Sequence, residues 1–185
     1  MHECIVKITG VTPYSQSKYI QVEKEKRETS ADHEKRVWRE RMHIDDEGIA
    51  FIPLMAIKNC LSEAAKYLQM QIPGKGKSTY TKHFEAGLIV ENHIPLNIKK
   101  EDVPGEWLHV PSDGRRGGTK RVLKCFPLFK EWGGEVTFRI LDDAITQEVF
   151  DFHIREAGKF IGLGRFRPRQ NGYYGRFNAE IVSWK

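Results

Sequence analysis

The feature that most constrains this chain's fold is the spacing of its apolar residues, which changes along the chain between the period of a strand and that of a helix. Apolar and polar residues alternate over residues 4–10, 135–141 and 176–184, and this period of two is typical of half-buried strands. Between the first two stretches, apolar residues recur at the spacing of one helical face. That face contains Ile57, Cys60, Leu61, Ala64 and Leu68. Strands separated by helices are therefore expected.

Further elements complete the pattern. Residues 49–52 predict a short strand, and Pro53 suits the start of the helix that follows. Residues 84–90 predict a second core strand. A second helix begins after a cap at Asp143 or Thr146. Its buried stripe is Phe150, Ile154, Ala157 and Ile161.

The resulting order is strand, helix, strand, strand, helix, strand. It predicts an α+β protein, specifically a ferredoxin-like (RRM-like) split βαβ sandwich. Its four-stranded antiparallel sheet carries two helices on one face, places the first and third core strands at its centre, and leaves the other face open to a ligand. With 185 residues, the chain predicts a single domain, 1–185, with long insertions at about 11–48 and 92–133.

The first insertion is a charged arm (residues 11–48). Within it, residues 31–42 predict a helix anchored by Val37 and Trp38. We expect residues 17–46 to be loosely ordered, or ordered only on binding. Two interpretations remain open for the arm: a solvated helix, or a segment that reaches a neighbouring subunit through Trp38. The second insertion is expected to be mostly irregular, with extended pieces at 107–110 and 120–125.

The net charge is +5, and the basic residues are distributed unevenly. Residues 157–179 and 114–130 contain basic residues and no acid, and Lys75, Lys77 and Lys82 form a third basic loop. A basic surface can serve solubility alone. Three acid-free basic loops favour a polyanionic partner instead. The third loop by itself is better explained as a solvated turn.

Residues 162–177, the glycine–arginine loop, combine glycines, arginines and aromatic residues without an acid. Glycine lets a backbone approach a ligand, arginine matches phosphate geometry, and aromatic rings stack on bases. The predicted nucleic-acid contacts are Gly162, Gly164, Arg165, Arg167, Arg169, Tyr173 and Arg176. The alternative is a tight helix-to-strand connection with solvated arginines. We favour binding, because arginines without a nearby acid repel one another unless an anion intervenes.

Residues 112–121 form a second glycine-rich basic loop. Its predicted contacts are Arg115, Arg116, Lys120 and Arg121. A mobile loop without a binding role explains this composition equally well.

Two motifs resemble a known family. They are Ile161-Gly162-Leu163-Gly164-Arg165 and Gly172-Tyr173-Tyr174-Gly175-Arg176-Phe177, and residues 48–53 are similar to the family's short strand leading into a proline and the first helix. Together they resemble the RAMP superfamily, the RNA-binding subunits of CRISPR effector complexes, and in particular its backbone subfamily. The chain is short for that subfamily, and residues 166–169 lengthen the loop. A stand-alone phage or mobile-element relative is also consistent with the resemblance.

The resemblance implies several partners. These are single-stranded RNA, further copies of this chain assembled along the strand, and CRISPR effector subunits. It also implies a protruding hairpin that folds over the RNA, at a position that matches residues 112–121.

The sequence therefore predicts non-enzymatic binding of single-stranded nucleic acid, RNA before single-stranded DNA. No cofactor or metal is expected, because no histidine pairs with a cysteine, acid or second histidine at metal-ligand spacing. Two alternatives remain: a RAMP-type endoribonuclease, with Asp113 as the residue to test, and a viral protein that binds or mimics a CRISPR effector subunit.

The absence of a long apolar run or a signal-peptide pattern predicts a cytoplasmic protein without a membrane partner. Cys4 and Cys60 lie within apolar patterns and are expected to be buried, reduced thiols.

Overall fold

The computed structural model describes residues 1–112, 117 and 119–185. Its central element is a four-stranded antiparallel sheet in the order β4, β8, β1, β9. These strands are β1 (His2–Gly10), β4 (Leu88–Val90), β8 (Gly133–Ile140) and β9 (Phe177–Trp184). The predicted α+β class and four-stranded antiparallel sheet are confirmed. The first and third core strands, β1 and β8, lie at the centre as expected.

One face of this sheet is buried. Cys4, Val6 and Ile8 alternate along β1 with exposed or half-buried residues. Cys4 lies opposite Phe138 and Val6 opposite Val136 in the antiparallel register with β8. All five side chains are in the core, so the period of two in the sequence marks the face that excludes water.

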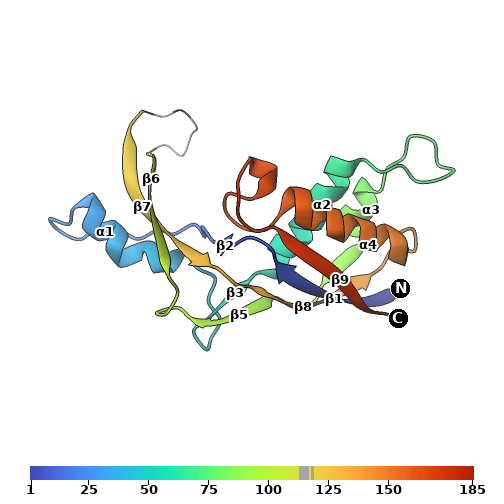
Figure 1. Ribbon diagram of the computed structural model, residues 1–185, viewed down its shortest axis with the longest axis horizontal. Helices are drawn as coiled ribbons and strands as arrows, with labels where there is room; N and C mark the ends of the chain where they lie inside the picture. The colour runs from blue at the N-terminus through green and yellow to red at the C-terminus, as the bar shows by residue number, and fades with distance from the viewer. Residues whose placement is uncertain (113–116, 118) are drawn as a thin grey trace.

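Helices cover the buried face (Figure 1). They are α2 (Leu54–Leu68), α3 (Thr81–Ala86), and α4 (Gln147–Glu156), which continues into the π-helical turn η2 (Ala157–Ile161). The α2 stripe is buried as predicted, except at Leu68, which is half-buried. Thr146 caps α4, because its side-chain oxygen accepts a hydrogen bond from the amide of Val149.

The strand predicted over residues 84–90 is wrong in its first half. Phe84 lies in α3, where it is fully buried and stacks on His153 with ring centroids 4.2 Å apart. Gly87 follows the helix, and a Cβ there would lie 2.5 Å from the carbonyl oxygen of His83. The strand begins only after this glycine, at Leu88.

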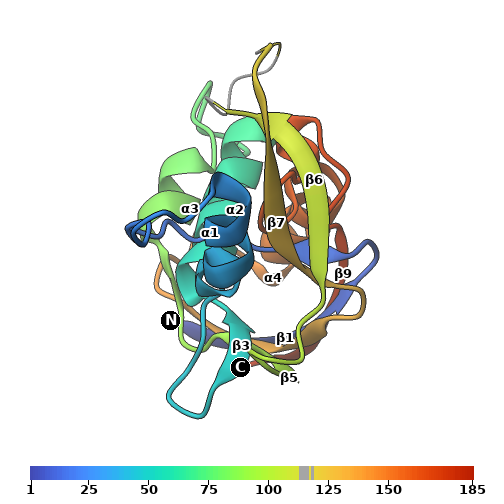
Figure 2. The same cartoon turned by 90° about the vertical axis from the view of Figure 1, so that its left-hand side faces the viewer.

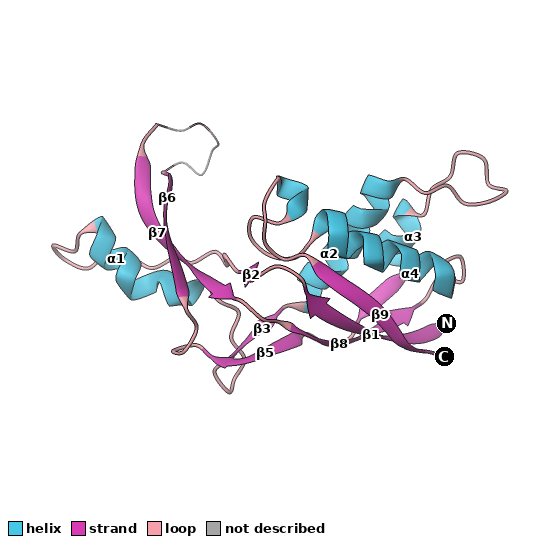
Figure 3. Cartoon of the chain, in the orientation of Figure 1, coloured by secondary structure: helices cyan, strands magenta, loops and turns pink. Residues whose placement is uncertain are grey.

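The described residues between 92 and 133 are mostly in strands, whereas a mostly irregular stretch was predicted. They contain β5 (Ile94–Lys99), which pairs with β3 (Ile49–Ile52), and a hairpin of β6 (Gly105–Pro111) and β7 (Arg121–Phe129). The predicted extended pieces at 107–110 and 120–125 fall within this hairpin. The short β2 (Tyr14–Ser15) joins its base by pairing with β7. Figure 3 shows the hairpin standing away from the four-stranded sheet.

The charged arm packs against this hairpin (Figure 1 and Figure 2). It contains α1 (Ser30–Val37) and the 3-10 helix η1 (Trp38–Arg41). Val37 and Trp38 are buried, as predicted for anchors. Trp38 packs beside Gly105, where a Cβ would lie 2.9 Å from its ring. It therefore anchors the arm to the hairpin of its own chain, and its ring is buried there rather than exposed toward a neighbouring subunit.

A buried ion-pair network fixes the arm. The Glu34 side chain is 1% exposed, and its carboxylate accepts hydrogen bonds from the Arg41 guanidinium (3.0 Å), Lys124 Nζ (2.9 Å) and the amide of Cys125 (2.8 Å). Burial alone would raise the pKa of Glu34, but the bonds from Arg41, Cys125 and Lys124 outweigh burial and lower it. The arm and the hairpin thus form one packed unit rather than a loosely ordered insertion.

Cys4, Cys60 and Cys125 are buried and form no disulfide, which confirms the prediction for the first two. Burial raises the pKa of the Cys60 thiol to about 12. Within the described parts of the chain, no helix has both the length and the apolar character needed to cross a membrane.

Candidate functional site

The glycine–arginine loop connects η2 to β9 and contains the short helix η3 (Pro168–Gln170) (Figure 3). Its backbone is tied to the segment around β2. The amide of Arg165 donates to the carbonyl of Ser15 (2.8 Å), and the amide of Gly175 donates to the carbonyl of Pro13 (2.8 Å). Segments far apart in sequence therefore place the loop beside the base of the hairpin.

The two glycines predicted to approach a phosphate are required by the fold itself. Gly162 and Gly164 have φ values of +73° and +81°, which favour glycine. A Cβ at Gly164 would lie 2.3 Å from the carbonyl oxygen of Ser15, and one at Gly162 would lie 2.6 Å from Pro168 Cδ. Internal packing thus explains both glycines without a ligand.

Glu106 of β6 holds one side of the loop. Its carboxylate accepts hydrogen bonds from the Arg165 guanidinium (3.2 Å) and from the Tyr174 hydroxyl (2.6 and 2.7 Å). The Arg165 side chain is only 9% exposed, lies 3.9 Å above the Phe126 ring and donates to Ser15 Oγ (3.2 Å). Burial lowers the pKa of Arg165, and the Glu106 charge acts in the opposite direction. Arg165 therefore joins the loop to the hairpin.

Glu63 of α2 holds the other side of the loop. Its carboxylate oxygens lie 2.9 Å from Arg167 Nη2 and 3.4 Å from Arg169 Nε. The prediction that no acid lies near these arginines is therefore wrong, because acids distant in sequence lie close to them in the fold. The acids come from helix α2 and strand β6, outside the loop.

Arg176 and Tyr173 remain accessible. Arg176 Nη1 lies 3.4 Å from the carbonyl oxygen of Tyr173, and the Arg176 amide donates to Thr12 Oγ1 (3.0 Å). No described carboxylate forms an ion pair with Arg176. The Tyr173 side chain is 62% exposed. Of the predicted loop contacts, these two are the freest to meet a ligand.

The described residues of the second basic loop lie at the free end of the hairpin, after β6 and before β7. Lys120 and Arg121 are exposed there, and Arg121 donates to the carbonyl oxygen of His109 (3.1 Å). Predicted contacts Arg115 and Arg116, and the alternative catalytic residue Asp113, lie outside the described residues. Arg121 precedes Phe126 by five residues on β7, which is roughly 17 Å at the usual rise of a strand. The two predicted basic sites therefore lie at opposite ends of one hairpin.

A groove of about 340 Å³ opens between the segment that follows β2 and the glycine–arginine loop. Gln16, Lys18, His43 and Arg165 supply polar walls, and the first turn of α2 contributes Ala56. None of the described residues that line it is an aspartate or glutamate. Lys18 is exposed, and its charge is the second cause, after burial, of the lowered pKa of His43. This cationic groove is the candidate site.

A second hollow of about 250 Å³ continues the groove along α2. The two share Ala56 and Gly164, and the second hollow also has Asn59, Glu63 and Arg167 in its walls. We call the groove and the second hollow together the path. It runs from the end near Lys18, which has no described carboxylate in its lining, toward the ion pairs of Glu63.

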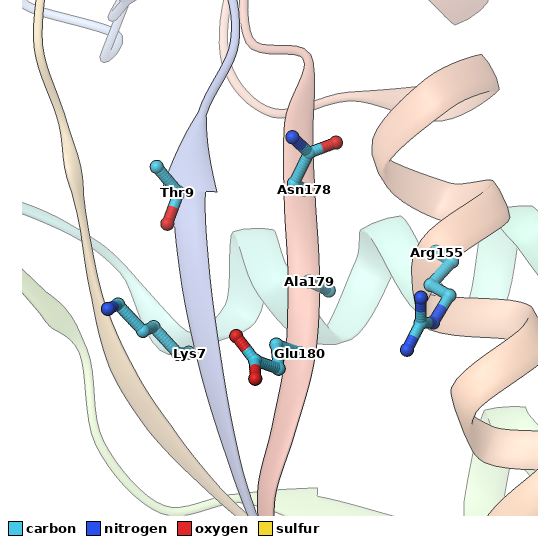
Figure 4. A pocket seen from close by; sticks show the side chains of 6 residues that line it. All are labelled: Lys7, Thr9, Arg155, Asn178, Ala179 and Glu180. Carbon is cyan, nitrogen blue, oxygen red and sulfur yellow. The ribbon is translucent and has the colours of Figure 1, made fainter.

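The open face of the four-stranded sheet has a different character. A hollow of about 420 Å³ lies there. Figure 4 shows Lys7 and Thr9 of β1 beside Asn178 and Glu180 of β9, which line it. Arg155 of α4 completes it at the sheet edge. Both charge signs are present and no aromatic ring lines this hollow within the described structure. The expectation that this face meets bases gains no support from it.

Sequence reasoning missed Lys18 and His43. Both belong to the charged arm, and nothing in their neighbourhood indicates a site. The His43 amide donates a hydrogen bond to Gln16 Oε1 (2.8 Å), and Arg165, 150 positions away from Ser15 in sequence, donates to Ser15 Oγ, so the segment around residues 15–18 brings both residues to the groove. The amino-acid composition does not reveal a contact between residues so far apart in sequence.

In comparisons with protein-family models and with curated proteins, nothing matches this chain. Among the described residues, no group of three or more histidines, cysteines and acids is placed to hold a metal ion.

Proposed function

We propose that this protein binds single-stranded nucleic acid, RNA in the first place, with the cationic groove as its central contact. One observation carries the proposal: none of the described residues that line the groove is an aspartate or glutamate, and Lys18 in its wall forms no ion pair with a described carboxylate, whereas the Arg165 charge is partly neutralised by Glu106. A concave, positively charged site of this size suits a phosphate and its nucleoside. Burial of Arg165 keeps its guanidinium fixed in place.

The surrounding residues extend this contact in the proposal. Arg176 supplies a cation that pairs with no described carboxylate, and Tyr173 supplies an exposed ring, on one side of the loop. Lys120 and Arg121 supply charge at the end of the hairpin. Arg167 and Arg169 are already neutralised in part by Glu63, so we assign them a smaller share of the binding energy.

We also propose that the core is the ferredoxin-like split βαβ fold. The strand order β4, β8, β1, β9 and the helices on one face support this assignment. The hairpin beside the glycine–arginine loop is consistent with the RAMP resemblance. Membership of that superfamily, and assembly of copies along an RNA strand, are part of the same proposal.

The test is a binding titration followed by fluorescence anisotropy, with labelled single-stranded RNA, single-stranded DNA and duplex DNA at several salt concentrations. The proposal expects tightest binding to a single strand. Affinity should fall with salt, because bound cations displace counterions from the phosphates. Lys18→Ala should weaken binding and reduce the slope of log affinity against log salt by about 0.7. Complex size on long RNA tests assembly along the strand.

Lys7→Ala is the matched control, since Lys7 is an exposed lysine on the open sheet face. It should leave affinity and slope unchanged. Failure of the wild-type protein to bind any single strand at low salt would refute the proposal, as would equal effects of the two variants. Capture of a protein partner without RNA affinity would favour the alternative of a protein-binding viral factor.

His43 supports a second candidate, the endoribonuclease. Its ring lines the cationic groove, and burial followed by the Lys18 charge lowers its pKa. A neutral imidazole at neutral pH is suited to general-base chemistry on a ribose hydroxyl. Cleavage of RNA, but not DNA, that is lost in His43→Ala would establish this activity, and intact RNA after prolonged incubation would exclude it.

A further inference from the structure

Two exposed aromatic rings meet on the helical layer, outside the groove. Tyr67 of α2 is 48% exposed and Phe160 of η2 is 45% exposed. Their ring centroids lie 5.8 Å apart with the planes tilted by 34°. We call Tyr67 and Phe160 the aromatic pair. Neither ring contributes to the core, so core packing does not account for the pair.

The pair lies at the end of the path that starts in the cationic groove. Ala56, Asn59, Glu63 and Tyr67 follow one another at intervals of three or four residues, so they occupy one stripe of α2. The first three line the hollow that continues the groove. Ala56 and Tyr67 are eleven residues apart, or roughly 17 Å along the helix axis. A strand leaving the groove along α2 therefore reaches the aromatic pair.

A cation accompanies these rings. The Arg169 guanidinium lies 5.4 Å from the centroid of the Tyr67 ring and 3.4 Å from Glu63. Glu63 is the carboxylate along this stripe, and Arg167 and Arg169 both pair with it. The end of the path thus has flat exposed rings with one excess positive charge. Bases stack on such rings and phosphates pair with such cations.

We propose that the aromatic pair is a stacking site for a base of the single strand whose backbone occupies the cationic groove. This inference rests on the proposed function and adds a second contact to it. The chemistry is sequence-tolerant, because every base has a π-face. Stacking should raise the affinity for long strands that span the path and leave the affinity for short strands, which fill the groove alone, unchanged.

The experiment compares Tyr67→Ala, Phe160→Ala and their double variant with the wild-type protein. Anisotropy titrations use a uridine dinucleotide and a long oligouridylate, each at several salt concentrations. The double variant should bind the long strand about tenfold more weakly with an unchanged salt slope, because stacking releases no counterion. Dinucleotide affinity should stay the same. Tyr67→Phe should restore long-strand binding, since the ring is kept.

Phe152→Ala is the matched control. Phe152 is a similarly exposed aromatic on α4, and it faces neither the groove nor the second hollow. Wild-type affinity for the long strand in the double variant would overturn the inference and leave the proposed function standing. Failure of the wild-type protein to bind either strand would overturn both. An equal loss in Phe152→Ala would also overturn the inference.

Discussion

At the residue scale, two glutamates distant in sequence hold the glycine–arginine loop. Glu106 receives Arg165 and Tyr174, and Glu63 receives Arg167 and Arg169. The sequence could not reveal these pairings, because 59 residues separate Arg165 from Glu106 and 104 separate Arg167 from Glu63. The composition of the loop wrongly implied that no acid lies near its arginines.

Glu106→Gln tests the role of this carboxylate. The substitution keeps the side-chain shape but leaves the mostly buried Arg165 without a counter-charge. We expect a loss of about 2–3 kcal/mol in the free energy of unfolding, measured by urea denaturation.

Glu91→Gln provides the comparison for Glu106→Gln. Glu91 pairs with Arg139 at 2.6 Å, and both side chains are substantially exposed. Its loss should cost less than about 1 kcal/mol. Equal effects of the two substitutions would contradict the interpretation of Arg165 as a buried structural cation.

His153 should make stability depend on pH. The residue is fully buried, Nδ1 lies 2.7 Å from the carbonyl oxygen of Val149, and Nε2 has no hydrogen-bond partner within the described structure. Burial lowers its pKa. The folded pKa thus lies below the unfolded value of about 6.5, so on acidification the unfolded chain binds the proton first. Stability is unaffected well above pH 6.5 and falls as the pH drops below it.

Denaturation at a series of pH values checks this dependence. His153→Gln should flatten part of the decline below pH 6.5, and the remainder belongs in part to His43, whose pKa is also lowered. A decline of the same steepness in the variant would show that His153 does not contribute.

At the element scale, the sequence predicted best where one face of an element is buried. Apolar residues alternate along β1 and β8 and recur with a helical period along α4, because the inner faces of these elements lie in the core. The hairpin gave a weak signal, since β6 has no fully buried residue and β7 has buried residues only near its base. Residues 84–90 were misassigned because a short apolar run does not distinguish a strand from a buried helical turn.

Glu34→Ala tests whether the arm and the hairpin form one unit. Removing this buried carboxylate leaves Arg41 uncompensated and frees Lys124, so we expect a loss of about 3 kcal/mol. Limited proteolysis should also cut faster within the charged arm. Lys35→Ala, on the exposed side of α1, removes only a solvent-exposed pair with Asp32 and should change neither measurement. An uncut arm in Glu34→Ala would show that other contacts hold it.

At the scale of the whole molecule, the two sides differ in chemistry. The hollow on the open sheet face contains both acids and bases, whereas the groove beside the hairpin is lined by Lys18 and Arg165 and by no described aspartate or glutamate, with Glu106 pairing Arg165 from outside the lining. The net charge of +5 does not say which surface carries the excess of cations. Only the folded arrangement identifies the groove, because its walls come from the charged arm, α2 and the glycine–arginine loop.

Photo-crosslinking tests the proposed binding of a single strand most directly. Single-stranded RNA containing 4-thiouridine is irradiated with the purified protein, and the crosslinked peptides are identified by mass spectrometry. The account predicts crosslinks to residues 14–18, to His43 or to the glycine–arginine loop, and their loss at high salt. Crosslinks confined to β1 and β9 around Lys7 and Glu180, or the absence of any crosslink at low salt, would contradict it.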